Sequence, residues 1–400
     1  MTCAKRITEA AHLRSCGIIL ANVAAFDMGS HMGKGTLAVL GGGHASEHDV
    51  SLLSAKNMGR SLKERGYTVL PVLIGESGLW NVMGEDYLAA AWPARIADAC
   101  PEALRSGHPL SAALELRARG VEVVVIGLHG RGGEDGSIQG FLEVAGFTYT
   151  GPGVKASALA IDKINLKRIL MALDLPTANY DVIRGHEVLG PGSLEAVLRR
   201  IMVQLGHRVV VKAPSLGSSV HVYMPKTEDE ALDAARRVLE VEDRVLVEQC
   251  IEGEEFTVPV LGTRQSPHPL PVIAIKPRLA GWFDRNSKYL QGGAEEIVPA
   301  PISRPLARRL QELAVRVHQV IGARGVTRTD FIVDRQGNPH ILELNTLPGM
   351  TDASLVPKAA AAAGLQMGDL LEELIAEARA AREDACPTSH VSLGTLAANC

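Results

Sequence analysis

Short runs of apolar residues recur along the chain and predict a series of buried strands. Residues 37–40, 67–74 and 121–126 are mainly apolar, and a glycine directly follows each run. Between the first two runs, apolar residues recur at helical spacing and predict an amphipathic helix that ends at Gly66. Its predicted buried face consists of Val50, Leu53, Met58 and Leu62. Strands that alternate with helices are typical of an open parallel α/β sheet.

The rest of the chain continues this alternation. Further strands are predicted at residues 147–150, 209–212, 220–224, 244–249, 256–261 and 271–276. Further helices are predicted at residues 137–145, 155–173, 228–240, 305–321 and 366–381. We therefore expect an α/β (α+β) fold with more than one hydrophobic core.

A β-hairpin is predicted near the C-terminus. Two apolar runs, residues 331–333 and 341–344, flank the polar, glycine-containing residues 335–338, which suit a four-residue loop. If Asp334 faces Pro339 across this loop, counting back along both strands pairs distant residues on one face. The predicted pairs are Asp330 with Glu343 and Arg328 with Asn345.

The predicted pairing of two carboxylates indicates a cation site. Like charges directly opposite each other destabilise a sheet, so Asp330 and Glu343 favour a cation between them. Together with Asn345 they form an all-oxygen set that suits Mg²⁺, which usually shares its shell with water and substrate phosphates. The alternative is a solvated hairpin face whose charges are incidental.

The composition excludes several classes of protein. Four hundred residues with 46% hydrophobic content are enough for two or three domains. A net charge of −4 without a basic stripe argues against nucleic-acid binding, and no apolar run is long enough to span a membrane. Six scattered cysteines without metal-binding spacing argue against zinc and disulfides and favour a reducing cytoplasm. We expect small-molecule partners.

Both ends of the chain are expected to lie outside the fold. Residues 28–32 have the sequence MGSHM, which is typical of a cloning scar, and we exclude residues 1–35 as an extension that is a tag or otherwise non-native. Residues 382–400 are small and polar and are expected to form a flexible tail.

The loop after the first strand is a candidate binding loop. Gly41 and Gly43 suggest a dinucleotide motif, but Ser46 replaces its third glycine and Glu76 comes late for a ribose contact. NAD binding is therefore not favoured. Glu47 lies at the carboxyl end of the strand, where open α/β sheets bind ligands, although an acid favoured at a helix start is an equal interpretation.

Three later loops also carry candidate chemistry. His129 begins a glycine-rich loop after the strand at residues 121–126, but it is equally interpreted as a capping or core histidine. Lys212 ends a strand before the Gly/Ser turn at residues 213–219, a combination that suits phosphate. Glu248, at a strand end, suits an adenine or ribose contact as well as a surface position. The long irregular stretch at residues 277–296 is typical of a lid.

Taken together and in order, these motifs closely resemble those of the D-alanine–D-alanine ligases of the ATP-grasp superfamily, over residues 36–381. The matching motifs are GGGHASEHDVS, LHGRGGEDGSIQG, the helix with Lys163, VVVKAPSLGSSV, VLVEQ with EEFTV, SKYL, and TRTD with LELNTLPGMT. The resemblance implies an ATP-grasp architecture with an N-terminal domain (residues 36–154), a central subdomain (155–251) and a C-terminal subdomain (252–381). It also implies a homodimer and ATP bound between the last two subdomains.

The resemblance also implies roles for residues around the nucleotide. Two Mg²⁺ ions, for which Mn²⁺ is an alternative, would be held by Asp330, Glu343 and Asn345. The implied nucleotide-site residues are Lys163, Lys212, Glu248, Ile251, Glu255 and Trp282, the last covering the adenine.

Further roles implied by the resemblance concern the amino acids and the reacting centre. Glu47 and His129 would hold the first D-alanine, and Lys288 and Ser354 would lie near the carboxylate of the second. Glu47, Ser218 and Tyr289 would form a hydrogen-bonded trio. Arg328 and the backbone N–H of Gly349 would form the oxyanion hole.

The chain departs from the family pattern near the phosphates. His221 stands where glycine is common, Gln249 where lysine often stands, and Ala213-Pro214 changes the position of the turn proline. These departures concern the geometry of the phosphate loop and the affinity for nucleotide.

The implied function is the joining of two D-alanines, through an acyl phosphate, for peptidoglycan precursors. One alternative is a related ligase that makes another dipeptide in a resistance or natural-product pathway. A regulatory nucleotide-binding protein without catalysis is a second, but such a protein would not need the opposed carboxylates.

Overall fold

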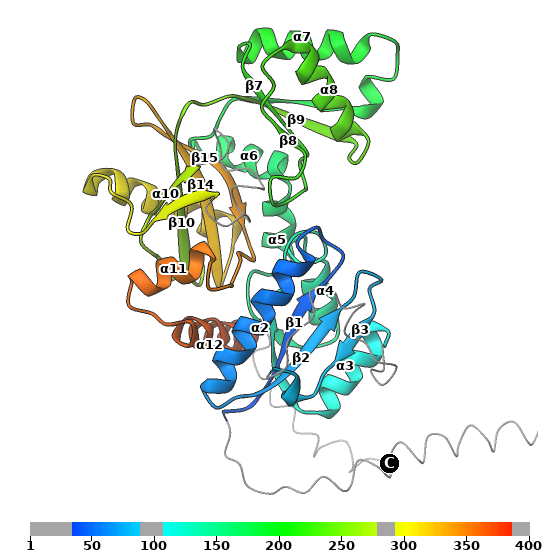
Figure 1. Cartoon of the computed structure of the whole chain (residues 1–400), viewed down its shortest axis with the longest axis vertical. Coiled ribbons are helices and arrows are strands. Elements are labelled where there is room, and N and C mark those ends of the chain that lie inside the picture. The colour runs from blue at the N-terminus through cyan, green and yellow to red at the C-terminus, as the bar shows by residue number, and fades with distance from the viewer. Residues whose placement is uncertain (1–33, 89–106, 278–292, 386–400) are drawn as a thin grey trace, which may run out of the picture. The chain divides into compact units, whose positions relative to one another are not determined.

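The computed structural model describes residues 34–88, 107–277 and 293–385. These residues form three sheets with helices packed against them (Figure 1). The α/β architecture, with a parallel N-terminal sheet and antiparallel sheets after it, confirms the expected fold class. The boundaries predicted between domains stay predictions. No helix in the described part of the chain is long and apolar enough to cross a membrane.

The N-terminal sheet has the order β3-β2-β1-β4-β5 and is parallel except for β3 at its edge. Its strands are β1 (Thr36–Gly42), β2 (Thr68–Ile74), β3 (Trp80–Val82), β4 (Val121–Ile126) and β5 (Thr148–Tyr149). Leu37 and Val39 point to a core shared with helices α2 (His48–Glu64) and α12 (Met367–Ala385). Ala38 and Leu40 point to the opposite core, under α3 (Pro109–Ala118) and α4 (Ser137–Val144).

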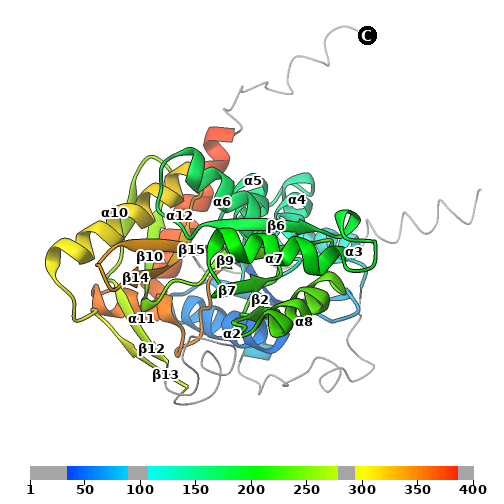
Figure 2. The same ribbon diagram turned by 90° about the horizontal axis from the view of Figure 1, so that it is seen from above.

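The central sheet is antiparallel and has the order β6-β9-β7-β8. Its strands are β6 (Tyr180–Arg184), β7 (Val209–Lys212), β8 (Val222–Tyr223) and β9 (Arg244–Gln249). Helices α7 (Ser193–Leu205) and α8 (Glu228–Leu239) cover one face and share a buried core with the strands (Figures 1 and 2).

The C-terminal sheet is antiparallel, with the order β13-β12-β10-β14-β15 and β11 beside β10. Its strands are β10 (Gly253–Gly262), β11 (Pro267–Pro269), β12 (Ile273–Pro277), β13 (Ala294–Ile297), β14 (Val326–Asp334) and β15 (Pro339–Asn345). Helix α10 (Arg304–Ile321) packs on one face with α5 (Val154–Ile161) and α6 (Lys163–Ala172). Helix α11 (Leu355–Ala362) joins α12 in the core that the N-terminal sheet shares.

The predicted hairpin is present with its four-residue loop at residues 335–338. The prediction was wrong by one position at the loop, because Val333 rather than Asp334 faces Pro339.

An irregularity in the hairpin restores the predicted pairing nearer the site. Leu342 is the extra residue of a β-bulge between two neighbouring pairs of the ladder. Beyond it, Asp330 faces Glu343 and Arg328 faces Asn345, as the alternation predicted.

The single helix predicted at residues 155–173 is wrong. Helix α5 ends at Ile161, and Asp162 has an extended backbone (φ −80°, ψ 97°) before α6 begins. One carboxylate oxygen of Asp162 accepts two backbone N–H groups of α6, both at 3.0 Å. Asp162 is therefore a helix cap, and the break places Lys163 in the first turn of a new helix.

Two smaller predictions also need correction. Leu53 is 57% exposed, because the buried face of α2 is formed by Leu52 and its helical neighbours instead. The strand predicted at residues 220–224 is confined to β8. Three residues before β8 have a positive φ that no strand allows: Ser218 at 51°, Ser219 at 57° and His221 at 52°.

Candidate functional site

Two cavities meet beside the β14–β15 hairpin. The larger cavity, of about 310 Å³, lies between loops of the N-terminal sheet, the turn after β7 and the segment after β15. The smaller cavity, of about 110 Å³, lies between the central and C-terminal sheets. Lys163, Leu216 and Glu343 line both cavities, so a ligand in one reaches groups that also face the other.

Asp330 lies at this junction with its charge already balanced. Its two oxygens accept hydrogen bonds from Nε and Nη2 of Arg328, both at 2.9 Å, and from Nδ2 of Asn345 at 3.0 Å. Thr257 Oγ1 donates a further hydrogen bond at 2.5 Å. Burial lowers the pKa of Arg328, but the charge of Asp330 and these hydrogen bonds outweigh burial and raise the pKa above its ordinary value.

Glu343 faces Asp330 across the hairpin and is paired with Lys163 Nζ at 3.2 Å. Among the described residues, no group of three or more His, Cys, Asp or Glu side chains could hold a metal ion. Two carboxylates and the amide oxygen of Asn345 fit a hard cation that takes its remaining ligands from phosphate and water. The residues at the junction therefore fit Mg²⁺, with the cationic side chains balancing the carboxylates.

Lys212 enters the smaller cavity from the end of β7 and is paired with buried Glu248 at 2.5 Å. The other Glu248 oxygen lies 2.8 Å from Nζ of Lys167, a residue that the sequence analysis missed. Burial raises the pKa of Glu248, but the two lysines outweigh it and lower the pKa to about 2. Lys167 occupies the apolar face of α6 four residues after Lys163, and a lysine in that stripe was the available signal.

Glu47 lies in the larger cavity and is 6% exposed. It is the N-cap residue of α2, where the helix dipole favours an acid, although its side chain makes no capping hydrogen bond. Ser46 Oγ donates to its carboxylate at 2.8 Å. A Cβ atom at Gly130 or at Gly217 would lie 2.7 Å from a Glu47 oxygen, so glycine at both positions leaves room for this carboxylate. Gly130 also has a φ of +64°, which favours glycine.

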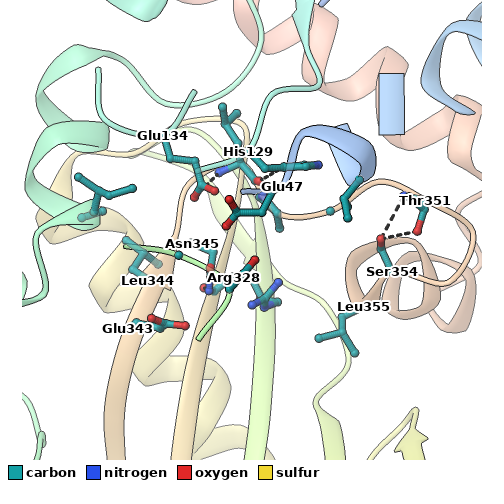
Figure 3. A pocket seen from close by; sticks show the side chains of 18 of the residues that line it. Glu47, His129, Glu134, Arg328, Glu343, Leu344, Asn345, Thr351, Ser354 and Leu355 are labelled. Carbon is teal, nitrogen blue, oxygen red and sulfur yellow. Dashed lines mark hydrogen bonds between the residues drawn. The ribbon is translucent and has the colours of Figure 1, made fainter. Parts of the chain in front are cut away.

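His129 lies beside Glu47 in the same cavity and is buried (Figure 3). Its Nδ1 lies 2.8 Å from the carbonyl oxygen of Leu347, and its Nε2 lies 2.9 Å from Ser54 Oγ. Burial lowers the pKa of His129, which favours the neutral ring.

Glu134 also lines the cavity and was missed by sequence reasoning, although it stands in the glycine-rich loop after β4. Oε1 accepts the N–H of Gly130 at 2.9 Å, and Oε2 accepts those of Thr346 at 3.3 Å and Leu347 at 3.5 Å. Burial raises the pKa of Glu134 to about 7. In Figure 3 the carboxylates of Glu134 and Glu47 lie close together, across from Arg328.

The remaining predicted residues are divided between the two cavities. Ser218, Gly349 and Ser354 line the larger cavity, and Ile251 and Glu255 line the smaller one. Ser354 Oγ accepts the N–H of Thr351 at 3.0 Å (Figure 3).

Three predicted site residues, Trp282, Lys288 and Tyr289, lie outside the described residues, as does most of the predicted lid. Their assigned roles stay predictions.

Two family models match the chain and together cover most of it. The model of the D-ala D-ala ligase N-terminus matches residues 36–152, and that of the D-ala D-ala ligase C-terminus matches residues 169–376. The chain belongs to the D-alanine–D-alanine ligase family.

Individual relatives agree with this membership of the D-alanine–D-alanine ligase family. The D-alanine–D-alanine ligase of Desulforudis audaxviator is 38% identical over 344 residues, which cover 85% of this chain and 97% of the relative. That of Pelotomaculum thermopropionicum is 36% identical over 339 residues, covering 85% and 95%. The structure of the D-alanine–D-alanine ligase from Coxiella burnetii matches with a TM-score of 0.76 at 27% identity, covering 88% of this chain and 96% of that one.

Proposed function

We propose that the larger cavity binds two amino acids and the smaller one ATP, with the reaction at the hairpin between them. The reaction is the ATP-dependent joining of two D-alanines for peptidoglycan synthesis, in accordance with the family. The observation that carries this assignment is the position of Asp330, Glu343 and Arg328, which lie where the cavities meet. A cytoplasmic location and a homodimer are parts of the same proposal.

The smaller cavity suits the nucleotide because two lysines line it. Lys212 and Lys163 lie there and attract phosphates, while Glu248 holds Lys212 in place. Burial lowers the pKa of Lys212, but Glu248 outweighs burial and raises it, so the ammonium stays charged. We assign Ile251, Glu255 and Trp282 to the nucleoside.

Asp330, Glu343 and Asn345 would hold two Mg²⁺ ions or, in their place, Mn²⁺. When bound, the ions neutralise phosphate charge and so favour transfer of the terminal phosphoryl group.

The first step activates the carboxylate of the first D-alanine. Glu47 holds its ammonium group by charge, with His129 beside it. A carboxylate oxygen attacks the terminal phosphorus of ATP, the bond to the bridging oxygen of ADP breaks, and an acyl phosphate forms. Lys212 and Arg328 stabilise the negative charge that develops on the transferred group.

The second step forms the peptide bond. Lys288 and Ser354 hold the carboxylate of the second D-alanine, whose deprotonated amine attacks the acyl carbon. Arg328 and the N–H of Gly349 stabilise the oxyanion, and phosphate leaves as the C–O bond breaks. Ser218, Tyr289 and Glu47 orient the reacting groups.

A panel of D- and L-amino acids, incubated with ATP and Mg²⁺, tests this function. We expect phosphate release and D-alanyl-D-alanine, identified by mass spectrometry, with D-alanine alone. Release only with another amino acid would favour the related ligase that makes a different dipeptide. Nucleotide binding without phosphate release for any amino acid would favour the regulatory alternative.

A further inference from the structure

The backbone of residues 346–350, directly after β15, is held by side chains that are distant in sequence. Glu134 accepts the N–H groups of Thr346 and Leu347, and His129 lies 2.8 Å from the Leu347 carbonyl oxygen. Ser54 Oγ accepts the N–H of Met350 at 3.2 Å. We call this set, Ser54, His129 and Glu134, the loop clamp. It ties the segment to α2 and to the loop after β4.

The carbonyl partner of the clamp histidine shows which ring nitrogen carries a proton. A carbonyl oxygen only accepts, so Nδ1 of His129 must carry a proton and donate to Leu347. Burial lowers the pKa of His129 and favours the neutral ring. In that form Nε2 accepts from the Ser54 hydroxyl, and Ser54 Oγ accepts from the N–H of Met350. Both ring nitrogens of His129 therefore have a partner within the protein.

Glu134 binds the segment at the end opposite to the Ser54 contact. Oε1 of Glu134 is held by the N–H of Gly130, within its own loop, while Oε2 reaches the backbone of Thr346 and Leu347. The segment between these anchors contains Gly349, whose N–H is assigned to the oxyanion hole. The other donor of that hole, Arg328, is fixed separately by Asp330 on β14.

We propose that Ser54, His129 and Glu134 are positioning residues that hold the Gly349 N–H in register with Arg328. This inference rests on the proposed function, because it concerns the stabilisation of the oxyanion. An oxyanion hole needs donors fixed before the charge develops, and small displacements of such donors slow the reaction about 10²-fold. The clamp supplies that fixation from a part of the chain remote from the hairpin.

Loosening the clamp should affect the second step more than the first. The acyl phosphate still forms, since the lysines and carboxylates of the phosphate site are untouched. If amine attack slows, water attacks the phosphorus of the acyl phosphate instead. This breaks the P–O bond, forms no acyl oxyanion, and releases D-alanine and phosphate without dipeptide. The ratio of phosphate to dipeptide, which is one in coupled turnover, should therefore rise.

The experiment compares Ser54→Ala and Glu134→Ala with a matched control, Ser51→Ala. Ser51 is a buried serine on the same helix, three residues earlier, but its hydroxyl donates to the carbonyl of Gly127 and accepts from Gly42. Phosphate and dipeptide are measured in the same samples, together with ADP affinity and the melting temperature.

We expect both clamp variants to form dipeptide about tenfold to 100-fold more slowly, with a phosphate-to-dipeptide ratio well above one and unchanged ADP affinity. Ser51→Ala should keep a ratio near one even if it melts at a lower temperature. Glu134→Gln, which keeps an acceptor oxygen, should recover part of the coupling.

A ratio that stays at one in both clamp variants, or that rises equally in Ser51→Ala, would overturn the inference. If either clamp variant does not fold, Asn57→Ala provides a milder test, because its Nδ2 donates to the Met350 carbonyl at 2.8 Å from a partly buried position. The wild-type protein tests the proposed function separately, since absence of dipeptide there would contradict the function and not the clamp.

Discussion

The carboxylate of Glu343 supplies one of the negative charges where the two cavities meet. Glu343 is 24% exposed at its side chain, paired with Lys163 and opposite Asp330. An amide at this position would keep the size of the side chain but remove the charge that a divalent ion requires.

We therefore expect Glu343→Gln to lower kcat by about 10²-fold or more at ordinary Mg²⁺, with little change in melting temperature. Initial rates over a range of Mg²⁺ concentrations test this, with Glu122→Gln as a control. Glu122 is a carboxylate on β4 that pairs with Arg379 at the surface. Full activity of Glu343→Gln would contradict the proposed metal role.

A second single residue should control part of the pH dependence of stability. His318 is fully buried, with Nδ1 2.8 Å from Thr327 Oγ1 and Nε2 3.2 Å from the Gly262 carbonyl oxygen. Burial lowers its pKa to about 4. His318 therefore takes up a proton near pH 6.5 in the unfolded chain but only near pH 4 in the folded protein. As the pH falls from about 6.5 to about 4, the stability that neutral His318 contributes is lost.

The difference corresponds to about 3 kcal/mol in the free energy of unfolding between pH 7 and pH 4. Urea unfolding of wild type and His318→Gln across this range should show a smaller pH dependence in the variant. Parallel curves would mean that His318 does not cause the loss. The comparison isolates His318, because the raised pKa of Glu134 acts in the opposite direction in both proteins.

Among single residues, the alternation of side chains along a strand was enough to predict the facing carboxylates of Asp330 and Glu343. Side chains two residues apart share a face, so the pairing of Asp330 with Glu343 survived an error at the loop, with the β-bulge restoring the register. Glu134 and Lys167 were not predictable in this way. Their partners come from other elements. The apolar stripe around Lys167 indicates only that this lysine is buried, and the loop around Glu134 does not indicate what its carboxylate binds.

The division between α5 and α6 is the clearest difference between prediction and structure among the elements. Apolar residues continue at helical spacing through the break, so the pattern alone cannot reveal it. The decisive feature is Asp162, whose capping bonds and ion pair with Arg244 at 3.0 Å favour a new helix start. Short edge strands such as β13 were missed for a related reason, because pairing with a neighbour rather than composition defines them.

Removal of this cap should be measurable. We expect Asp162→Ala to lower the free energy of unfolding by about 1–2 kcal/mol and to weaken ATP binding, since Lys163 is the first residue of α6. Asp162→Asn should retain most of the stability, because an amide oxygen also caps, although it loses the charge facing Arg244. Urea unfolding and ATP titration of both variants test these expectations. Equal losses in both variants would indicate that the ion pair, and not the cap, is responsible.

The architecture of the whole molecule was predictable in outline because apolar residues recur at strand or helix spacing along the chain. The contacts that join the sheets were not predictable, because they connect residues such as Ser54 and Met350 that lie 296 positions apart.

A prediction for the whole chain concerns the residues before the first strand. The first strand, β1, begins at Thr36.

Deletion of residues 1–32 should therefore leave the melting temperature and turnover unchanged. Thermal unfolding and dipeptide formation of the shortened chain test this prediction. A large loss in either quantity would show that the segment contributes to the folded enzyme.

Lys167 links the central and C-terminal sheets behind the smaller cavity. It is fully buried, pairs with Glu248 on β9, and donates to Thr177 Oγ1 at 2.6 Å. Thr177 in turn donates to the carbonyl oxygen of Ile341 on β15 at 2.8 Å. One ammonium group therefore serves both walls of the proposed nucleotide site and also balances the carboxylate that holds Lys212.

Lys167→Met should leave Glu248 with half of its compensating charge, and removal of one partner from a buried ion pair typically costs about 3–5 kcal/mol. We expect a lower melting temperature and a KM for ATP raised about tenfold, whereas Lys155→Met, on the exposed side of α5, should change neither. Adding Glu248→Gln to Lys167→Met removes the carboxylate and leaves buried Lys212 without its partner, so the double variant should be no more stable than Lys167→Met and its KM for ATP should stay high. A double variant more stable than Lys167→Met would mean that Lys212 does not depend on Glu248.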